Sequence, residues 1–192
     1  ATWWEGALKD GRNRGNHPYY CPAGWKRYSI GGYGSGADFE RKFEGWNVVY
    51  HGTKGSVAAK ILTTPFYGTV GCWTNDPVLY VSPSIEYCAH PRYAKPWKLD
   101  NGKYVQMVLM CRVNPVHVHC KKPQTLLKDH TVKIDANFDN NVLEWLIRPD
   151  MTDHQISSKK IICYGIMLRV LDPATFKSHW WPKSWGADTA FV

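Results

Sequence analysis

The stretch Trp46–Leu62, WNVVYHGTKGSVAAKIL, decides the fold because a buried strand gives way to a helix within it. The apolar run Val48–Tyr50 predicts the strand, and the helix is predicted by apolar residues at helical spacing: Val57, Ala58, Ile61 and Leu62. His51, Gly52 and Thr53 separate the two elements. Any turn residues can end a strand, so an imidazole, a bare backbone position and a hydroxyl at this junction raise the question of a further role.

Strand patterns dominate the rest of the chain. Further strands are predicted at Val78–Val81, Lys103–Val113, Val116–His119, Asn141–Pro149 and Lys160–Val170. Besides the helix after Thr53, short helices are predicted at Ala37–Glu44 and from Ser82, with Ser82 as the cap and Pro83 as the first helical residue. The pattern indicates an α+β fold in which two mostly antiparallel sheets pack face to face, with a few short helices at the side.

Length and composition predict one compact domain, because the chain has 192 residues of which 44% are hydrophobic. Residues 1–45, which include the flexible joint Gly31–Gly36, are expected to form an N-terminal extension that packs on a core at 46–192. The tryptophan clusters near the two ends are interpreted as structural, those at 180, 181 and 185 within a Trp-rich C-terminal tail. The start at Ala1 suggests a domain cut from a longer protein, and no apolar run has the length of a membrane span.

The six cysteines are widely spaced and form no CxxC pair, which favours free thiols in a reducing compartment, the cytosol or nucleus. An even number of cysteines also permits disulfides. His117 and His119 in VHVHC have the spacing of a metal-binding pair on one strand face, but no further ligands follow, so no metal site is expected. Cys72 has no identifiable partner that would make it a nucleophile.

The net charge of +8 is unevenly spread along the chain. Residues 90–135 contain nine Lys and Arg residues and only three Asp residues. Such a basic region, 90–135, can attract a phosphate-bearing ligand or nucleic acid, and a solvated basic face explains it equally well.

Three fragments place a polar group inside an apolar pattern: YHGT at Tyr50–Thr53, VLYVSPSIEY at Val78–Tyr87 and NVLEWLI at Asn141–Ile147. Glu144 is the most unusual, because ionised groups avoid sites between large apolar residues unless they are paired or functional. Strand alternation also allows Glu144 to face solvent. Together and in this order, the fragments resemble the catalytic core of the ADP-ribosyltransferase superfamily, in the diphtheria-toxin-like branch that includes the poly(ADP-ribose) polymerases. The resemblance covers about residues 46–170.

The resemblance implies a catalytic triad of His51, Tyr80 and Glu144, with NAD as co-substrate. Glu144 would accept a hydrogen bond from the ribose 2′-hydroxyl and stabilise the positive charge that develops on the sugar. His51 and Thr53 would contact NAD, and the backbone of Gly52 would pair with the nicotinamide carboxamide. Tyr80 would pack against the nicotinamide ring.

A second stacking tyrosine is implied after Tyr80, and the alignment leaves two candidates open. Tyr87 reproduces a Ser-x-x-Tyr spacing with Ser84, whose hydroxyl is then a candidate contact to the carboxamide. Tyr93 in HPRYA lies nearer to the usual separation from the first tyrosine. Plain packing is the alternative for either residue.

Two departures from the family pattern bear on the reaction. Val142 stands where arginine-modifying members carry Glu or Gln, which argues against transfer to arginine by that device. The separation of Tyr80 from Glu144 is short for a polymerase, which favours mono-ADP-ribosylation of a protein acceptor, the chain itself included. The alternatives are a nucleic-acid-directed transferase, an NAD glycohydrolase and an inactive module that binds NAD or ADP-ribose.

Overall fold

The structure is a computed structural model of the chain, and it describes residues 2–3, 8–64, 66–70, 77–150 and 154–179. The predictions made for several residues therefore lie outside the described part of the chain: Trp4, Cys72, Trp180, Trp181 and Trp185.

Every strand pairing within the described residues is antiparallel. The larger sheet has the order β1 (Thr2–Trp3), β4 (Lys26–Ser29), β14 (Ile161–Leu171), β10 (Tyr104–Val113) and β5 (Asn47–Gly52), with β9 (Trp97–Lys98) paired to β10. The smaller has the order β11 (Val118–Lys122), β12 (Glu144–Ile147), β8 (Pro77–Val81) and β7 (Thr69–Val70). Two short pairs complete the strands: β2 (Leu8–Asn13) with β3 (Pro18–Cys21), and β6 (Phe66–Tyr67) with β13 (Gln155–Ile156). The predicted α+β class with antiparallel sheets is confirmed, with two small sheets beyond the two expected.

The described residues contain four short α-helices: α1 (Gly36–Lys42), α2 (Gly55–Ile61), α3 (Ile85–Cys88) and α4 (Pro173–Ser178). Helix α3 begins later than predicted, and its cap is Ser84 rather than Ser82. The Ser84 hydroxyl accepts the Tyr87 backbone N–H at 3.1 Å, whereas the Ser82 hydroxyl accepts the N–H of Ser84 itself. The two serines therefore form consecutive turns that end β8 and begin α3.

Two predicted strands begin later than expected because 3₁₀ turns occupy their first residues. The turn η1 (Pro115–His117) replaces the first half of the predicted strand Val116–His119, with Asn114 accepting the Val116 N–H at 3.3 Å. The turn η2 (Asn140–Val142) likewise precedes β12. As a result, His117 and His119 do not share one strand, and Glu144 is the first residue of its strand rather than a central one.

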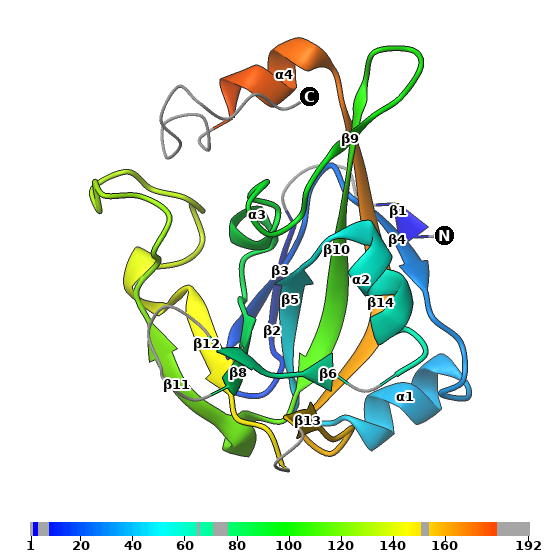
Figure 1. Cartoon of the computed structure of the whole chain (residues 1–192). Helices are drawn as coiled ribbons and strands as arrows, with labels where there is room; N and C mark the ends of the chain where they lie inside the picture. The colour runs from blue at the N-terminus through cyan, green and yellow to red at the C-terminus, as the bar shows by residue number, and fades with distance from the viewer. Residues whose placement is uncertain (1, 4–7, 65, 71–76, 151–153, 180–192) are drawn as a thin grey trace.

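The larger sheet is buried on both faces, which explains the nearly continuous apolar runs of β5 and β10. Val48, Tyr50 and Met110 point to one face, where they pack with α3 and with Trp25 of the N-terminal segment. The alternate residues point to the other face, where Val49 and Leu109 pack with Trp145 of the smaller sheet and with α2. Figure 1 shows α2 in front of β10 and β14, and β8, β12 and β11 to one side of them.

The N-terminal segment contributes to the larger sheet itself, because β4 pairs with β14 in the register Ile166–Tyr28. Trp25, immediately before β4, is completely buried. Its indole N–H donates to Glu86 on α3 at 3.2 Å, and the guanidinium of Arg169 from β14 lies 4.3 Å from its ring centroid. Residues 1–45 thus help to fix the helix that follows β8.

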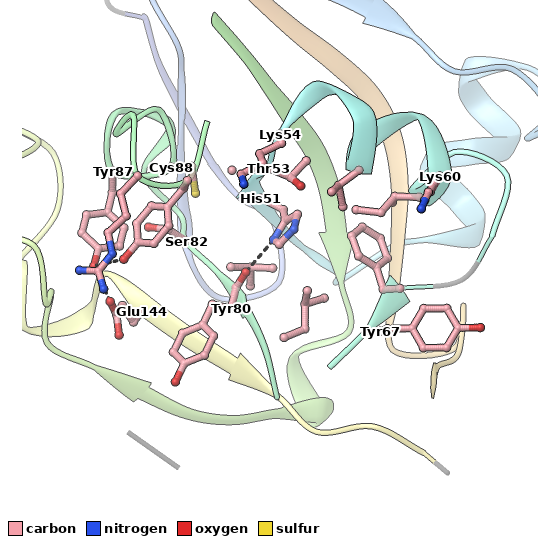
Figure 2. A pocket seen from close by; sticks show the side chains of 18 of the residues that line it. His51, Thr53, Lys54, Lys60, Tyr67, Tyr80, Ser82, Tyr87, Cys88 and Glu144 are labelled. Carbon is pink, nitrogen blue, oxygen red and sulfur yellow. Dashed lines mark hydrogen bonds between the residues drawn. The ribbon is translucent and has the colours of Figure 1, made fainter. Parts of the chain in front are cut away.

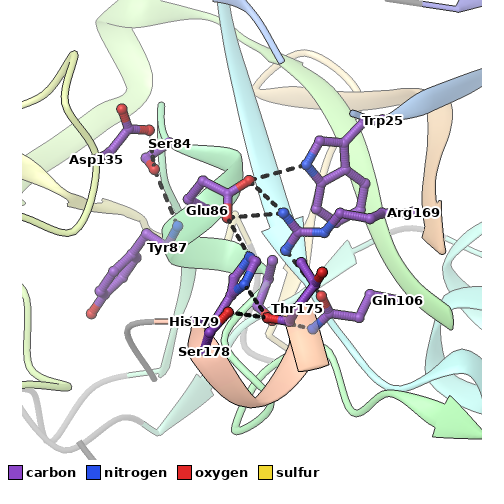
Figure 3. A network of polar contacts seen from close by, with 11 residues as sticks. Trp25, Ser84, Glu86, Tyr87, Gln106, Asp135, Arg169, Thr175, Ser178 and His179 are labelled. Atoms are coloured by element: carbon purple, nitrogen blue, oxygen red, sulfur yellow. Dashed lines mark hydrogen bonds and ion pairs between the residues drawn. The ribbon is translucent and has the colours of Figure 1, made fainter. Parts of the chain in front are cut away.

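A partly buried ion pair anchors α3 to the larger sheet (Figure 3). The guanidinium of Arg169 donates to both oxygens of Glu86 at 2.8 and 3.0 Å, and also to Gln106 at 3.0 Å. His179, after α4, lies 3.8 Å from the same carboxylate. Since α3 spans only four residues, these contacts set its position more than its own backbone bonds do.

Candidate active site

A cavity of about 650 Å³ is lined by residues of β5, β8, β12, α2 and α3. Strands β5 and β8 belong to different sheets, and an isolated bridge joins them, with backbone hydrogen bonds of 2.7 and 3.0 Å between Tyr50 and Ser82. This bridge fixes the two sheets relative to each other next to the predicted site. His51, Tyr80 and Glu144, each from a different strand, consequently line the same cavity (Figure 2).

His51 occupies the end of β5, where its ring is fixed from two sides. Its Nδ1 lies 2.9 Å from the backbone carbonyl of Tyr80, a distance at which the Nδ1–H tautomer donates and leaves Nε2 as an acceptor. The edge of the ring meets Phe66, with 5.7 Å between centroids. Burial lowers the pKa of His51, against a raising effect of the bond to Tyr80, so the imidazole is neutral at neutral pH.

Glu144 is buried, with 3% of its surface exposed, which excludes the alternative that it faces solvent. Its Oε1 accepts hydrogen bonds from the hydroxyl of Tyr87 and from Oγ1 of Thr125, the latter at 2.6 Å. Its Oε2 is buried without a hydrogen-bond partner among the described residues. A buried carboxylate oxygen in that state is energetically costly, which is the usual signature of a functional position.

Burial raises the pKa of Glu144, and several neighbours oppose that effect. The hydrogen bonds from Thr125 and Tyr87 act most strongly, followed by the positive charges of Arg92 and Lys122. Lys122 is the cross-strand partner of Glu144 in the β11–β12 register. The side chain therefore combines desolvation with specific stabilising contacts in a cavity, an arrangement typical of groups with a chemical role.

Both candidates for the second tyrosine line the cavity, and the structure gives them different contacts. Tyr87 is buried, and its hydroxyl is shared between the Glu144 carboxylate and the backbone N–H of Thr125, which donates at 3.2 Å. Tyr93 is half-buried, with its hydroxyl 3.4 Å from that of Tyr87 and the two ring centroids 5.7 Å apart. Tyr87 thus contacts the Glu144 carboxylate directly, and Tyr93 contacts Tyr87.

Gly52, in the sequence HGT at the end of β5, is required for packing as well as being predicted to contact a ligand. A Cβ at Gly52 would lie 2.1 Å from the backbone oxygen of Cys88 and 2.8 Å from the Cβ of Tyr93. Only glycine lets the end of α3 approach β5 this closely. Gly52 and Thr53 both line the cavity, so the predicted contact to NAD remains compatible with this packing role.

Ser84 is not among the residues that line the cavity. Its hydroxyl caps α3 and donates to Asp135 at 2.6 Å, so the structure gives it a role in holding the helix rather than the predicted contact to the carboxamide. Ser82 lines the cavity instead. The Ser-x-x-Tyr pattern therefore marks a capped helix start that positions Tyr87.

Three features of the site were not predicted. Thr125 contacts Glu144 from the segment 123–139, where the sequence PQTLLK offers no pattern that singles it out. The cations Lys54, Lys60 and Arg92 line the cavity, as does the aromatic pair Phe66 and Tyr67. Figure 2 shows Tyr87 and Glu144 toward one end of the cavity, Lys60 and Tyr67 toward the other, and His51 between them. Among the described residues that line it, Glu144 is the only carboxylate, which favours an anionic ligand.

The basic residues of region 90–135 have different surroundings. Arg112 is buried at 2% exposure and paired with Glu40 at 2.8 Å, so it serves the core. Lys121 lies over the ring of Trp145, 4.1 Å from its centroid. Lys95 before β9, Lys98 at its end and Lys103 after it are exposed. Within the described residues no group of three or more His, Cys, Asp or Glu side chains could hold a metal ion.

The five cysteines in the described part of the chain are all free thiols, as predicted: Cys21, Cys88, Cys111, Cys120 and Cys163. Cys88 lines the cavity and donates to the backbone oxygen of Tyr50 at 3.1 Å, and burial raises its pKa above the usual range of a thiol. A thiol in this state is a poor nucleophile. None of the described helices is long and apolar enough to cross a membrane.

Comparison with known proteins adds no relationship to these observations: no protein-family model matches the chain, and no curated protein matches it.

Proposed function

We propose that the chain is an NAD-dependent ADP-ribosyltransferase with the fold of that superfamily. The observation that carries the proposal is the buried carboxylate of Glu144, with one oxygen held by two hydroxyls and the other left without a partner among the described residues. His51 and Tyr80 line the same cavity from two further strands. The motifs around the three residues resemble those of the diphtheria-toxin-like branch, and the resemblance supplies their roles.

In the proposed reaction the bond between the nicotinamide nitrogen and ribose C1 breaks, and its electron pair leaves with neutral nicotinamide. Positive charge then develops on the ribose. Glu144 stabilises that charge and accepts a hydrogen bond from the 2′-hydroxyl at Oε2, the oxygen to which no described residue donates. The low-dielectric surroundings of a residue that is 3% exposed strengthen this interaction.

The remaining groups bind and orient the dinucleotide. The neutral imidazole of His51 presents Nε2 as an acceptor for a ribose hydroxyl, since its Nδ1 is engaged by the carbonyl of Tyr80. Tyr80 packs against the nicotinamide ring, with Tyr87 or Tyr93 as the second aromatic contact. The positive charges of Lys54, Lys60 and Arg92 complement the two phosphates of NAD.

The acceptor is proposed to be a protein, modified with a single ADP-ribose. A nucleophilic oxygen of the acceptor forms a bond to ribose C1 as nicotinamide departs, and a hydroxyl acceptor releases its proton to solvent. Water in place of the acceptor gives NAD hydrolysis. Val142 precedes Glu144 by two positions and carries no polar atom in its side chain, which argues against an arginine acceptor.

A silent module that binds NAD or ADP-ribose is the second candidate. The observation that favours it is the burial of Glu144, which raises its pKa and so favours the neutral side chain, and a neutral carboxyl group cannot stabilise a positive charge on the ribose. Calorimetry with NAD, run beside a turnover assay, separates the two candidates. Binding without turnover identifies the silent module.

The test uses NAD labelled in the adenylate half, incubated with the chain and with mixed protein and nucleic-acid acceptors. We expect nicotinamide release and label on protein as single units, both lost in Glu144→Gln. Glu44→Gln, at an exposed position, is the matched control and should behave as wild type. Label on nucleic acid instead identifies the nucleic-acid-directed alternative, and nicotinamide release without transfer identifies a glycohydrolase. Equal activity of wild type and Glu144→Gln overturns the proposal.

A further inference from the structure

The segment 123–139, between β11 and η2, folds over α3 and the start of β12. Four of its apolar side chains form a cluster with Tyr87 and Leu143: Leu126, Leu127, Ile134 and Phe138. Asp135 from the same segment accepts the Ser84 hydroxyl at 2.6 Å, which ties the segment to the cap of α3. The segment therefore covers the residues that surround Glu144.

Two buried amides hold this segment in shape. Gln124, 1% exposed, accepts the N–H groups of Leu126 and Leu127 at Oε1, both at 2.8 Å, and donates to the Leu127 carbonyl at 2.8 Å. Asn140 donates to the carbonyls of His130 and Val132 at 3.2 and 2.7 Å. Thr125, directly after Gln124, consequently has a fixed backbone despite lying outside any helix or strand.

Thr125 makes two contacts with the proposed active site. Its backbone N–H donates to the Tyr87 hydroxyl at 3.2 Å, and its own hydroxyl donates to Oε1 of Glu144 at 2.6 Å. Tyr87 donates to the same carboxylate oxygen. Both donors therefore bind Oε1, and their combined direction determines which way Oε2 points.

We propose that Thr125 is a positioning residue of the transfer reaction, which holds Oε1 of Glu144 so that Oε2 is the oxygen available to the ribose. This inference rests on the proposed function. A carboxylate that rotates freely presents either oxygen and loses alignment with the sugar, and small misplacements of a reacting group are costly in rate. Thr125 itself touches neither ribose nor nicotinamide in this proposal.

The ionisation of Glu144 gives the inference a second consequence. The charged and titratable groups around the carboxylate are Tyr87, Tyr93 and Cys88 from α3 and the turn after it, Arg92 from the same turn and Lys122 from β11. The Thr125 hydrogen bond lowers the pKa of Glu144 against the raising effect of burial. Its removal raises that pKa, and an activity that needs the ionised carboxylate then requires a higher pH.

The test compares Thr125→Val, which keeps the shape and removes the hydroxyl, with Thr125→Ser, which keeps the hydroxyl. We expect Thr125→Val to lower kcat roughly tenfold, with KM for NAD nearly unchanged, as follows from the loss of one hydrogen bond to a charged group. The acidic limb of its kcat/KM profile should move to higher pH. Thr125→Ser should restore both kcat and the profile.

A titration of the Glu144 side-chain carboxyl carbon by NMR, without NAD, provides a readout that does not depend on activity. The pKa of Glu144 should be higher in Thr125→Val than in wild type and Thr125→Ser. Equal kcat, pH profile and pKa in all three proteins overturn the inference while wild-type turnover keeps the proposed function. Absence of NAD turnover in wild type overturns the proposed function, and the positioning role with it.

Discussion

Tyr87 and Glu144 are separated by 57 positions in the sequence, and the phenol of the first donates a hydrogen bond to the carboxylate of the second. The bond links a four-residue helix of one layer to the first residue of a strand in another. Because α3 is held by its cap and by the Glu86–Arg169 ion pair, the position of the carboxylate depends on contacts far from the cavity. Some substitutions should therefore lower both stability and activity. Others should lower activity without lowering stability.

Glu144→Gln is expected to abolish NAD turnover without loss of stability at neutral pH. The pKa of Glu144 is raised in the folded state, so the unfolded chain releases this proton more readily. Its contribution to stability is therefore unfavourable above the ordinary carboxyl pKa of 4.5 and disappears as pH falls below that value. The glutamine oxygen can still accept from Thr125 and Tyr87, so the variant removes the charge and keeps those bonds.

Urea unfolding of wild type and Glu144→Gln at pH 5 and pH 8 measures this effect. The free energy of unfolding of the variant minus that of wild type should be larger at pH 8 than at pH 5. A smaller difference at pH 8 would show that the carboxylate is stabilised in the folded state, contrary to the sign of its pKa shift.

Gly52→Ala should destabilise the fold by about 2 kcal/mol, in the range of overpacking in a close-packed interior. The added Cβ meets the backbone oxygen of Cys88 at 2.1 Å, and backbone cannot swing aside as a flexible side chain can. Gly55→Ala is the matched control, since a Cβ there meets nothing within 4 Å and the residue is in α2. That variant should be neutral or more stable by up to about 1 kcal/mol.

Urea denaturation of both glycine variants gives the comparison, and the NAD assay adds a second readout. We expect Gly52→Ala to lose turnover as well, because the cavity wall at Tyr93 must move. If Gly52→Ala were as stable as Gly55→Ala, the close approach of α3 to β5 would not exist in solution.

The strands were predictable because each has a local signal, whereas the three motif residues were selected together, because the order of their fragments resembles that of a known family. The apolar runs of β5, β10 and β14 follow from burial, and His51, Tyr80 and Glu144 stand out as polar groups within such runs. The N-cap of α3 was misassigned because Ser82 and Ser84 are both residues that favour an N-cap. Only the bridge between Tyr50 and Ser82 decides between them. Thr125 could not be found at all, since its role arises from a fold of segment 123–139 that long-range contacts define.

Glu86→Gln should destabilise the protein by about 2 kcal/mol, below the value of a fully buried pair because the Glu86 side chain is 28% exposed. Arg169, at 7% exposure, would keep its charge and lose the negative charge of Glu86. Arg41→Ala breaks an exposed pair with Asp38 and is the control, with an expected cost under about 1 kcal/mol.

The same Glu86→Gln variant tests whether the anchor of α3 supports the site. We expect lower turnover at a temperature where the variant remains folded, because α3 carries Tyr87 and Tyr87 holds Glu144. Thermal unfolding and the NAD assay run in parallel provide the measurement. Unchanged turnover in a destabilised variant would show that the Glu86–Arg169 pair contributes to stability but does not position the site.

His90 should make the protein sensitive to acid. The side chain is fully buried, and its Nδ1 accepts the Arg92 backbone N–H at 3.1 Å. Burial, with a smaller effect of the Arg92 charge, lowers the pKa of His90 to about 3. The unfolded chain binds this proton near the ordinary value of 6.5 and the folded chain does not, so stability is lost as pH falls from 6.5 toward 3.

The measurement is urea unfolding of wild type, His90→Gln and the control His119→Gln, an exposed position on β11, between pH 7 and pH 4.5. Each pH unit below 6.5 should cost wild type up to about 1.4 kcal/mol through His90, before the contributions of other groups. His90→Gln keeps an acceptor for Arg92 and has no proton to bind, so its stability should fall less steeply with acid, even where it is lower at pH 7. His119→Gln should retain the wild-type slope. Equal slopes in all three proteins would mean that His90 takes up its proton as readily in the folded chain as in the unfolded one.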